Sequence, residues 1–258
     1  LGLDAFDVLQ GFERRMIENL SRETLAASII VPLYNEEEIL RSLICDLKGA
    51  FSDLAFEVEF ILCENGSRDR TRRVARELAA QYLDVTMVAI DRPSYGGAIR
   101  EGIAAARADI VIVFNADLWC KRFLFDSLLL LQNGYDIVIG SKRLRPDLDH
   151  RRWLRRAITA SFNVFLRCVF GFRGTDTHGM KALRRSRILP IIESCRTVNE
   201  VFDTELVLLA QGAGMRICEL PTQVLDARPA RLSLIRRIPS TIRDLYVIWR
   251  NLRKQRRS

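Results

Sequence analysis

The sequence lacks the patterns that mark several common classes of protein. Its six cysteines form neither CxxC pairs nor a Cys/His spacing, which excludes the usual zinc motifs. It has no run of about 18 uncharged apolar residues that would span a bilayer alone. No lysine-bearing P-loop is present, which argues against an NTPase, and no signal-peptide pattern is visible in a chain that begins at Leu1. We expect a reducing compartment, with most cysteines serving as small core residues.

The 258 residues are 48% hydrophobic, which is typical of a soluble protein with one large domain. The net charge of +8 is placed unevenly, because residues 231–258 contain nine Lys or Arg and one acid and so account for the whole excess. We expect three parts. These are an amphipathic helix over 1–26, a main domain over 27–231 and a basic amphipathic helix over 232–258.

Apolar segments alternate with helical segments along the main domain. Strands are expected at 27–31, 58–63, 85–90 and 109–114. Helices are expected from Asn35 towards Phe51, over 71–81, and from the turn at 93–97 to Arg107. Acids 36–38 lie in the first turn of the first of these helices. Turn residues follow each strand. This alternation predicts an α/β fold with a doubly wound, mostly parallel sheet.

The stretch 109–119 runs from an apolar, β-branched strand directly into Asn115-Ala116-Asp117. In open α/β sheets, ligands bind in the crevice at the carboxyl ends of the strands. A carboxylate there suits a hard divalent cation that also carries substrate phosphates. The alternative is that Asp117 only caps the following helix, and an isolated Asn-x-Asp leaves both interpretations open.

Four segments, in this order and spacing, resemble the motifs of family 2 glycosyltransferases. They are residues 28–37 (Ser-Ile-Ile-Val-Pro-Leu-Tyr-Asn-Glu-Glu), 64–71 (Glu-Asn-Gly-Ser-Arg-Asp-Arg-Thr), 95–102 (Tyr-Gly-Gly-Ala-Ile-Arg-Glu-Gly) and 115–117. The resemblance covers roughly residues 27–232. It is strongest to polyprenyl-phosphate glycosyltransferases of the dolichol-phosphate mannose synthase type, and further matches support this subgroup at 137–143, 174–179, 202–205, 219–221, Asp226 and Arg228.

The resemblance implies a GT-A fold, a nucleotide-diphosphate sugar donor, a polyprenyl phosphate acceptor, inversion at the sugar and a divalent metal, Mg²⁺ or Mn²⁺. It implies that Asp117 meets this metal and is catalytic. A Gly-rich turn that opens a helix also suits phosphate. The residues assigned to the donor are Pro32, Tyr34, Glu36, Glu64, Asn65, Gly97, Asn115, Ala116 and Asp117.

The chain departs from the family pattern at several positions. Asn115 replaces the first aspartate of Asp-x-Asp, Trp119 stands where Gln is often found, and Ser94 replaces the first glycine of the Gly-rich turn. Two alternatives therefore stay open. One is a family 2 transferase with a glycan or small lipid acceptor, and the other is a degenerate member that binds nucleotide or membrane without chemistry.

A phosphate acceptor needs cations more than a base, because its second pKa lies near 6 and it is already largely ionised at neutral pH. Arginine suits this task through its fork geometry. By resemblance, Arg143 and Arg155 are assigned to catalysis, and the acceptor set is Lys142, Arg143, Arg155, Asp176, Glu205 and Arg228. The bland alternatives are surface charges for the cations, a turn residue for Asp176 and an exposed helix acid for Glu205. His178 fits a turn residue better than a catalytic base.

In the tail, apolar residues recur at helical steps among basic ones, and Pro239 suits a first helical turn. The apolar stripe is Ile235, Ile238, Ile242, Leu245, Trp249 and Leu252. This pattern suits the cytoplasmic face of an anionic membrane, where the protein would be peripheral. The same stripe would equally pack on the body or on a second copy, and a membrane subunit is a further candidate partner. Nucleic acid is not expected, since the body has no aromatic-laced basic face.

Overall fold

The computed structural model describes residues 25–54, 56–145, 147, 149, 153–199, 201–223 and 233–255. At 154–155, 233–238 and 254–255 it describes the backbone alone. The helix expected over 1–26 therefore lies outside the described residues, apart from Leu25 and Ala26, which begin the first strand.

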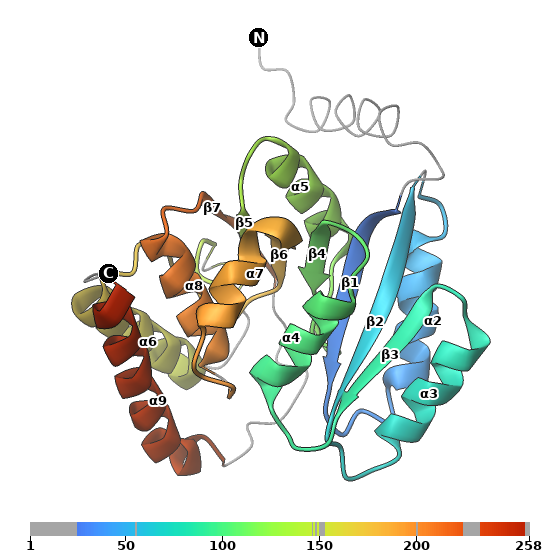
Figure 1. The fold of residues 1–258 in the computed structure, drawn as a ribbon, viewed down its shortest axis with the longest axis horizontal. Helices are drawn as coiled ribbons and strands as arrows, with labels where there is room; N and C mark the ends of the chain where they lie inside the picture. Colours follow the sequence, from blue (N-terminus) through green and yellow to red (C-terminus); the bar gives the residue numbers. More distant parts are fainter. Residues whose placement is uncertain are drawn as a thin grey trace.

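A seven-stranded sheet forms the centre of the described chain, in the order β3-β2-β1-β4-β6-β5-β7 (Figure 1). Neighbouring strands are parallel except around β6, which runs antiparallel to both β4 and β5. The predicted mostly parallel α/β sheet is confirmed. The strands are β1 (Leu25–Leu33), β2 (Glu57–Asn65), β3 (Val85–Ile90), β4 (Ile110–Val113), β5 (Ile137–Ser141), β6 (Lys181–Arg184) and β7 (Ile217–Pro221).

Helices cover both faces of the sheet, because its central strands are apolar on both sides. Along β1, Ile29 and Val31 belong to one core and Ile30 to the other. The first core is covered by α2 (Leu40–Phe51), α3 (Thr71–Gln81) and α5 (Lys121–Gln132). The second is covered by α4 (Tyr95–Ala105), α6 (Trp153–Phe170), α7 (Arg185–Ser194), α8 (Phe202–Gly212) and α9 (Ser233–Gln255).

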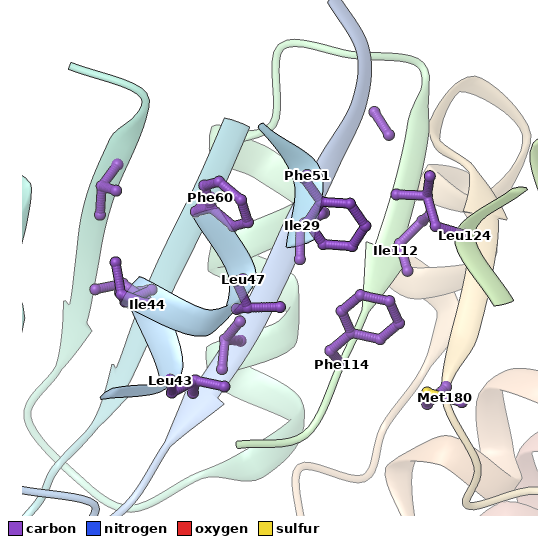
Figure 2. Close-up of a cluster of buried hydrophobic side chains, with 14 of the residues drawn as sticks. Ile29, Leu43, Ile44, Leu47, Phe51, Phe60, Ile112, Phe114, Leu124 and Met180 are labelled. Atoms are coloured by element: carbon purple, nitrogen blue, oxygen red, sulfur yellow. The ribbon is translucent and has the colours of Figure 1, made fainter. Parts of the chain in front are cut away.

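The first core shows how the α2 pattern is used. Leu43, Leu47 and Phe51 recur at steps of four, so one side of the helix faces the sheet. Figure 2 shows these side chains in one cluster with Phe60 of β2 and Phe114, which follows β4, and the ring centroids of Phe51 and Phe60 are 6.3 Å apart. This packing holds the first two strand exits and the central one in a fixed relation.

The first helix begins later than the sequence predicts. We expected it to open at Asn35, but α2 begins at Leu40, and Glu36 lies in the turn before it. The prediction was wrong because Asn35 has a φ of 55°, which is outside the right-handed helical region. A turn follows it, in which the N–H groups of Ile39 and Leu40 both donate to the Glu36 carbonyl.

The C-terminal helix forms, and part of its apolar stripe packs on the body. The apolar side chains of Leu245, Ile248 and Trp249 pack against the second core. Ile242 of the same stripe is 61% exposed, and the side chains of Ile235 and Ile238 lie outside the described residues. Pro239 is also not in the first turn, because α9 begins at Ser233. Among the described helices, none is both long and apolar enough to cross a membrane.

Candidate active site

Three segments meet at one edge of the sheet. β4 ends at Val113 and β5 at Ser141, while β6 begins at Lys181, which pairs with both neighbouring strands. Because β6 is antiparallel, the turn before it reaches the edge at which β4 and β5 end. Adjacent strands lie roughly 5 Å apart, so the Asp117 segment, the turn before β6 and the Lys142 segment leave the sheet from neighbouring positions.

The loops after β1 and β2 are tied together by hydrogen bonds. The Asn35 N–H donates to Ser67 Oγ at 3.1 Å, and the Asn35 side-chain oxygen accepts from the Arg68 N–H at 2.8 Å. The Glu36 N–H donates to Thr71 Oγ1 at 2.7 Å. Asn35 has a φ of 55°, a left-handed conformation that asparagine tolerates better than most residues. The loops after β1 and β2 therefore form one connected unit.

Glu64 and Asn65, the last two residues of β2, accept hydrogen bonds from these and neighbouring loops. Glu64 is buried, and its two oxygens accept from the Ser67 N–H at 2.5 Å and from Arg72 Nε at 2.6 Å. The Asn65 side-chain oxygen accepts from the Ser94 N–H at 2.5 Å. Both predicted donor residues lie at the expected edge. Their described contacts link the loops to one another, so they shape the site.

The Gly-rich turn uses its amide groups internally. Ser94 is the N-cap of α4, and its Oγ accepts from the Gly97 N–H at 3.1 Å. The Gly96 N–H donates to the Val198 carbonyl at 2.9 Å. A Cβ at Gly96 would lie 2.6 Å from the Phe202 ring, so this position requires glycine for close packing. The N–H of Gly97 thus serves the helix cap in this structure, and its role toward the donor stays a prediction.

The turn after β4 presents Asp117 outward. The N–H of Asn115 donates to the carbonyl of Leu118, and the reverse bond has the same 3.1 Å length. Within this tight turn, Ala116 is buried and Asp117 is exposed. Trp119 packs its ring 6.3 Å from that of Phe51 and is a partly buried member of the first core. The departure at Trp119 is thus a packing feature.

The donor atoms at this turn fit a hard divalent cation. Asp117 supplies an exposed carboxylate, and the amide of Asn115 is a second oxygen ligand of the right type. Among the residues that the structure describes, no group of three or more His, Cys, Asp or Glu side chains comes together. This sparse set suits Mg²⁺ or Mn²⁺, which keep most positions for water and substrate phosphate rather than needing a protein cage.

The acceptor-side residues after β5 meet the turn before β6. Ser141 Oγ lies 2.6 Å from Thr175 Oγ1, and the Lys142 N–H donates to Asp176 at 3.4 Å. The His178 N–H donates to the same carboxylate at 2.9 Å. Burial raises the pKa of Asp176, but the charge of Lys142 and the His178 N–H outweigh this, and the pKa lies below its ordinary value. Asp176 therefore stays ionised beside Lys142 and Arg143.

Other predicted site residues are placed differently. Glu205 is buried rather than exposed, and it accepts from the Thr197 N–H at 2.7 Å and from Asn251 Nδ2 at 2.8 Å. It holds the loop before α8 and the helix α9, so its described role is to position other segments. The Arg228 prediction and the side chain of Arg155 lie outside the described residues. Pro32 and Leu33 are the last residues of β1, and Tyr34 follows them. Pro32 and Tyr34 are half-buried and lie at the expected edge of the sheet.

A buried polar cluster beside the site was missed. Lys181 Nζ forms an ion pair with Asp203 at 2.8 Å, and the Tyr95 hydroxyl donates to the same carboxylate at 3.1 Å. Lys181 and Asp203 are buried. This cluster joins β6, α8 and the first residue of α4. A lysine in the short apolar strand 180–183 was the only local signal, and its partner stands 22 positions later.

His178 predicts how stability changes with pH. Burial lowers the pKa of His178, outweighing the attraction of Asp203 and Asp176, so the folded protein keeps this ring neutral. The unfolded chain takes up a proton below about pH 6.5, so the free energy of unfolding should fall as the pH decreases from 7 to 5. Urea denaturation at both pH values should show a smaller fall in His178→Asn.

The chain offers a control for this prediction, because it has only one other histidine, His150. His150→Asn measured alongside assigns the remaining pH dependence. If His178→Asn keeps the full dependence of the wild type, then the neutral, buried state of this ring is not its cause.

The sheet order and the helices on both faces define a GT-A fold. Solved structures support it. A mannosyl-3-phosphoglycerate synthase from Rubrobacter xylanophilus is similar with a TM-score of 0.66 at 18% identity, over 95% of this chain and 78% of that one. A glucosyl-3-phosphoglycerate synthase from Mycobacterium tuberculosis, solved with Mn²⁺, UDP and phosphoglyceric acid, gives 0.62 at 19% identity, over 93% and 82%. At these identities the likeness shows the fold alone.

The model of the family described as "Glycosyl transferase family 2" matches residues 28–190, and the chain belongs to this family. An undecaprenyl-phosphate 4-deoxy-4-formamido-L-arabinose transferase from Pseudomonas fluorescens is 31% identical over 200 residues, which cover 75% of this chain and 55% of that protein. A dolichyl-phosphate beta-glucosyltransferase from Trichomonas vaginalis is 28% identical over 214 residues, 76% of this chain and 64% of the other. The chain thus matches little more than half the length of these relatives.

Proposed function

We propose that this chain transfers a sugar from a nucleotide-diphosphate sugar to a polyprenyl phosphate, with inversion and with the help of a divalent metal. The observation that carries the proposal is the arrangement at one sheet edge. An exposed acid, Asp117, follows β4, and the basic pair Lys142 and Arg143 follows β5. These two strands are parallel, and only the antiparallel strand β6 lies between them in the sheet. Relatives named for undecaprenyl and dolichyl phosphate support the acceptor class.

On the donor side, Asp117 and Asn115 would hold Mg²⁺ or Mn²⁺. When bound, this ion neutralises the charge that grows on the departing diphosphate. The loops after β1 and β2 form the wall on which the nucleotide lies, with Pro32, Tyr34 and Glu36 at the surface of the wall. Glu64 and Asn65 hold that wall rigid through the hydrogen bonds described above, which limits the reorganisation needed on binding.

On the acceptor side, Lys142 and Arg143 would hold the phosphate that attacks. Its oxygen is already ionised at neutral pH, so the side chains need only place it in line with the bond to the leaving diphosphate. Asp176 lies against Lys142 and fixes its position. A single displacement of this kind inverts the sugar carbon. We place the reaction at the cytoplasmic face of a membrane, where the lipid phosphate is exposed to the nucleotide sugar.

A transfer assay tests the proposal. Purified protein is incubated with radiolabelled UDP- and GDP-sugars, Mn²⁺ and a polyprenyl phosphate in detergent, and the organic phase is analysed. We expect label in an acid-labile glycolipid with at least one donor, and loss of label with EDTA. Label that appears only on a glycan or a small lipid would contradict the acceptor class. Nucleotide binding without any transfer would instead identify a degenerate member.

A further inference from the structure

Helix α6 carries an unusual exposed surface. Its buried side chains Asn163, Leu166 and Phe170 recur at steps of three and four and face the protein. Large apolar side chains on its other side are exposed. They are Trp153 (78% exposed), Ile158 (48%), Val164 (55%), Phe165 (41%) and Val169 (47%). These five account for half of the large apolar residues that are exposed in the described part of the chain.

The exposed residues form one continuous face. At 3.6 residues per turn, the exposed uncharged residues of α6 span about 160° of the helix surface. They are Trp153, Ala157, Ile158, Ser161, Val164, Phe165, Cys168 and Val169, and we call them the α6 face. Soluble proteins rarely expose a continuous apolar area of this kind without a partner.

The charged side chains that belong to α6 are of one sign. The helix contains three arginines and no acid. Two of them, Arg156 and Arg167, are exposed and lie along one border of the face. Arg156 also lies 4.0 Å from the buried carboxylate of Asp149. An apolar face with arginines along its border matches the surface of an anionic bilayer, where apolar side chains enter the acyl boundary and cations meet lipid phosphate.

The position of α6 in the chain connects this face to the acceptor residues. The helix follows the Lys142 and Arg143 segment, and it ends five residues before Thr175 and six before Asp176. On α9, Leu245, Ile248 and Trp249 pack against the second core, while Ile242 (61%) and Tyr246 (59%) are exposed. In Figure 1, α6 lies at the end of the molecule opposite α2 and α3.

We infer that the α6 face, rather than the apolar stripe of α9, docks this protein on an anionic lipid bilayer. The biological purpose of this docking rests on the proposed function, since docking there would bring the acceptor phosphate to Lys142 and Arg143. Vesicle binding itself can be tested whether or not the protein transfers a sugar. A second copy of the chain is the competing occupant.

The native cysteines report on the two ends of the molecule. Cys168 lies on the α6 face and Cys45 on α2, and both are exposed and unpaired. In full-length protein with Cys120 and Cys218 changed to serine, Cys45→Ser leaves Cys168 for an environment-sensitive fluorophore, and Cys168→Ser leaves Cys45. Cys63 and Cys195 are buried.

With vesicles of phosphatidylcholine and phosphatidylglycerol, we expect the Cys168 probe to shift to the blue and brighten, and the Cys45 probe to stay unchanged. The inference is overturned if the Cys168 probe does not respond, or if both probes respond alike. It is also overturned if the Cys168 signal rises with protein concentration in the absence of vesicles, which would assign the face to a second copy.

Substitutions separate docking from catalysis. Phe165→Glu with Val169→Glu should weaken vesicle binding by at least about tenfold, because two apolar side chains leave the lipid. Leu83→Glu is the control, since Leu83 is an exposed apolar residue as well (106%, against 41% for Phe165 and 47% for Val169) but lies between α3 and β3. With a short, water-soluble prenyl phosphate, the double variant should transfer as well as the wild type. If the wild type fails on this acceptor, the proposed function fails while the vesicle result still judges the α6 face.

Discussion

Asp117→Ala should lower the rate of sugar transfer by about 100-fold to 1,000-fold, the range seen when one group that stabilises a developing negative charge is removed. Asp117 is the exposed acid that follows the central strand β4, and the metal proposed there loses its one charged protein ligand. Initial rates at saturating donor, measured over a range of Mn²⁺ concentrations, check this expectation. Asp117→Asn should behave similarly, because it keeps the shape and removes the charge.

Asn115 supplies a matched control two residues away. Asn115→Asp adds a carboxylate at the same turn and should reduce the Mn²⁺ concentration needed for half-maximal activity. Circular dichroism of each variant shows whether the fold is kept. Transfer that persists at the wild-type rate in Asp117→Ala, with or without EDTA, would remove the metal site from the proposal.

Lys181→Met should lower the free energy of unfolding by about 3–5 kcal/mol, because it leaves the charge of Asp203 buried without its partner. Lys181 and Asp203 are buried and 2.8 Å apart, so solvent does not screen the pair. Urea denaturation followed by tryptophan fluorescence measures the loss. The Tyr95 hydroxyl also donates to Asp203, so α4 and its Gly-rich turn should loosen as well.

Two variants control this measurement. Lys181→Met combined with Asp203→Leu should recover most of the loss, since no unpaired charge remains. Arg73→Met breaks an exposed ion pair with Glu77 on α3 and should cost no more than about 0.5 kcal/mol. A loss in Lys181→Met as small as that of Arg73→Met would show that the buried pair contributes little.

The two buried contacts that most shape the site connect residues far apart in the chain. Glu64 holds the loop after β2, and Lys181 joins β6 to α8. Neither side chain is assigned a direct role in the proposed chemistry. They hold the loop after β2 and the start of β6, which lie at the same edge of the sheet as Asp117 and Lys142.

Much of the fold could be predicted from local pattern. The helix expected over 71–81 and the strand expected over 85–90 form with those bounds. Apolar periodicity and turn residues are properties of neighbouring positions, so they are visible before the chain folds. The four ordered motifs likewise predicted the family, which the match over residues 28–190 confirms.

Side-chain roles were harder to predict, because the partner of a polar group is often distant in sequence. Glu205 was assigned to the acceptor by resemblance, with an exposed helix acid as the alternative, but it is buried and accepts hydrogen bonds from Thr197 and Asn251. Gly97 looked like a phosphate contact, but the Ser94 cap takes its N–H. In both positions a neighbour that the local pattern does not contain satisfies the polar group.

The sequence by itself determined the α/β alternation, the family and the acid that follows the central strand, because each depends on residues next to one another. Only the tertiary structure decided which apolar helix surface is covered. Leu245, Trp249 and Leu252 of the α9 stripe pack against the second core, while the apolar face of α6 is exposed. Both helices carry the same kind of periodicity, and burial depends on what the rest of the fold brings against each one.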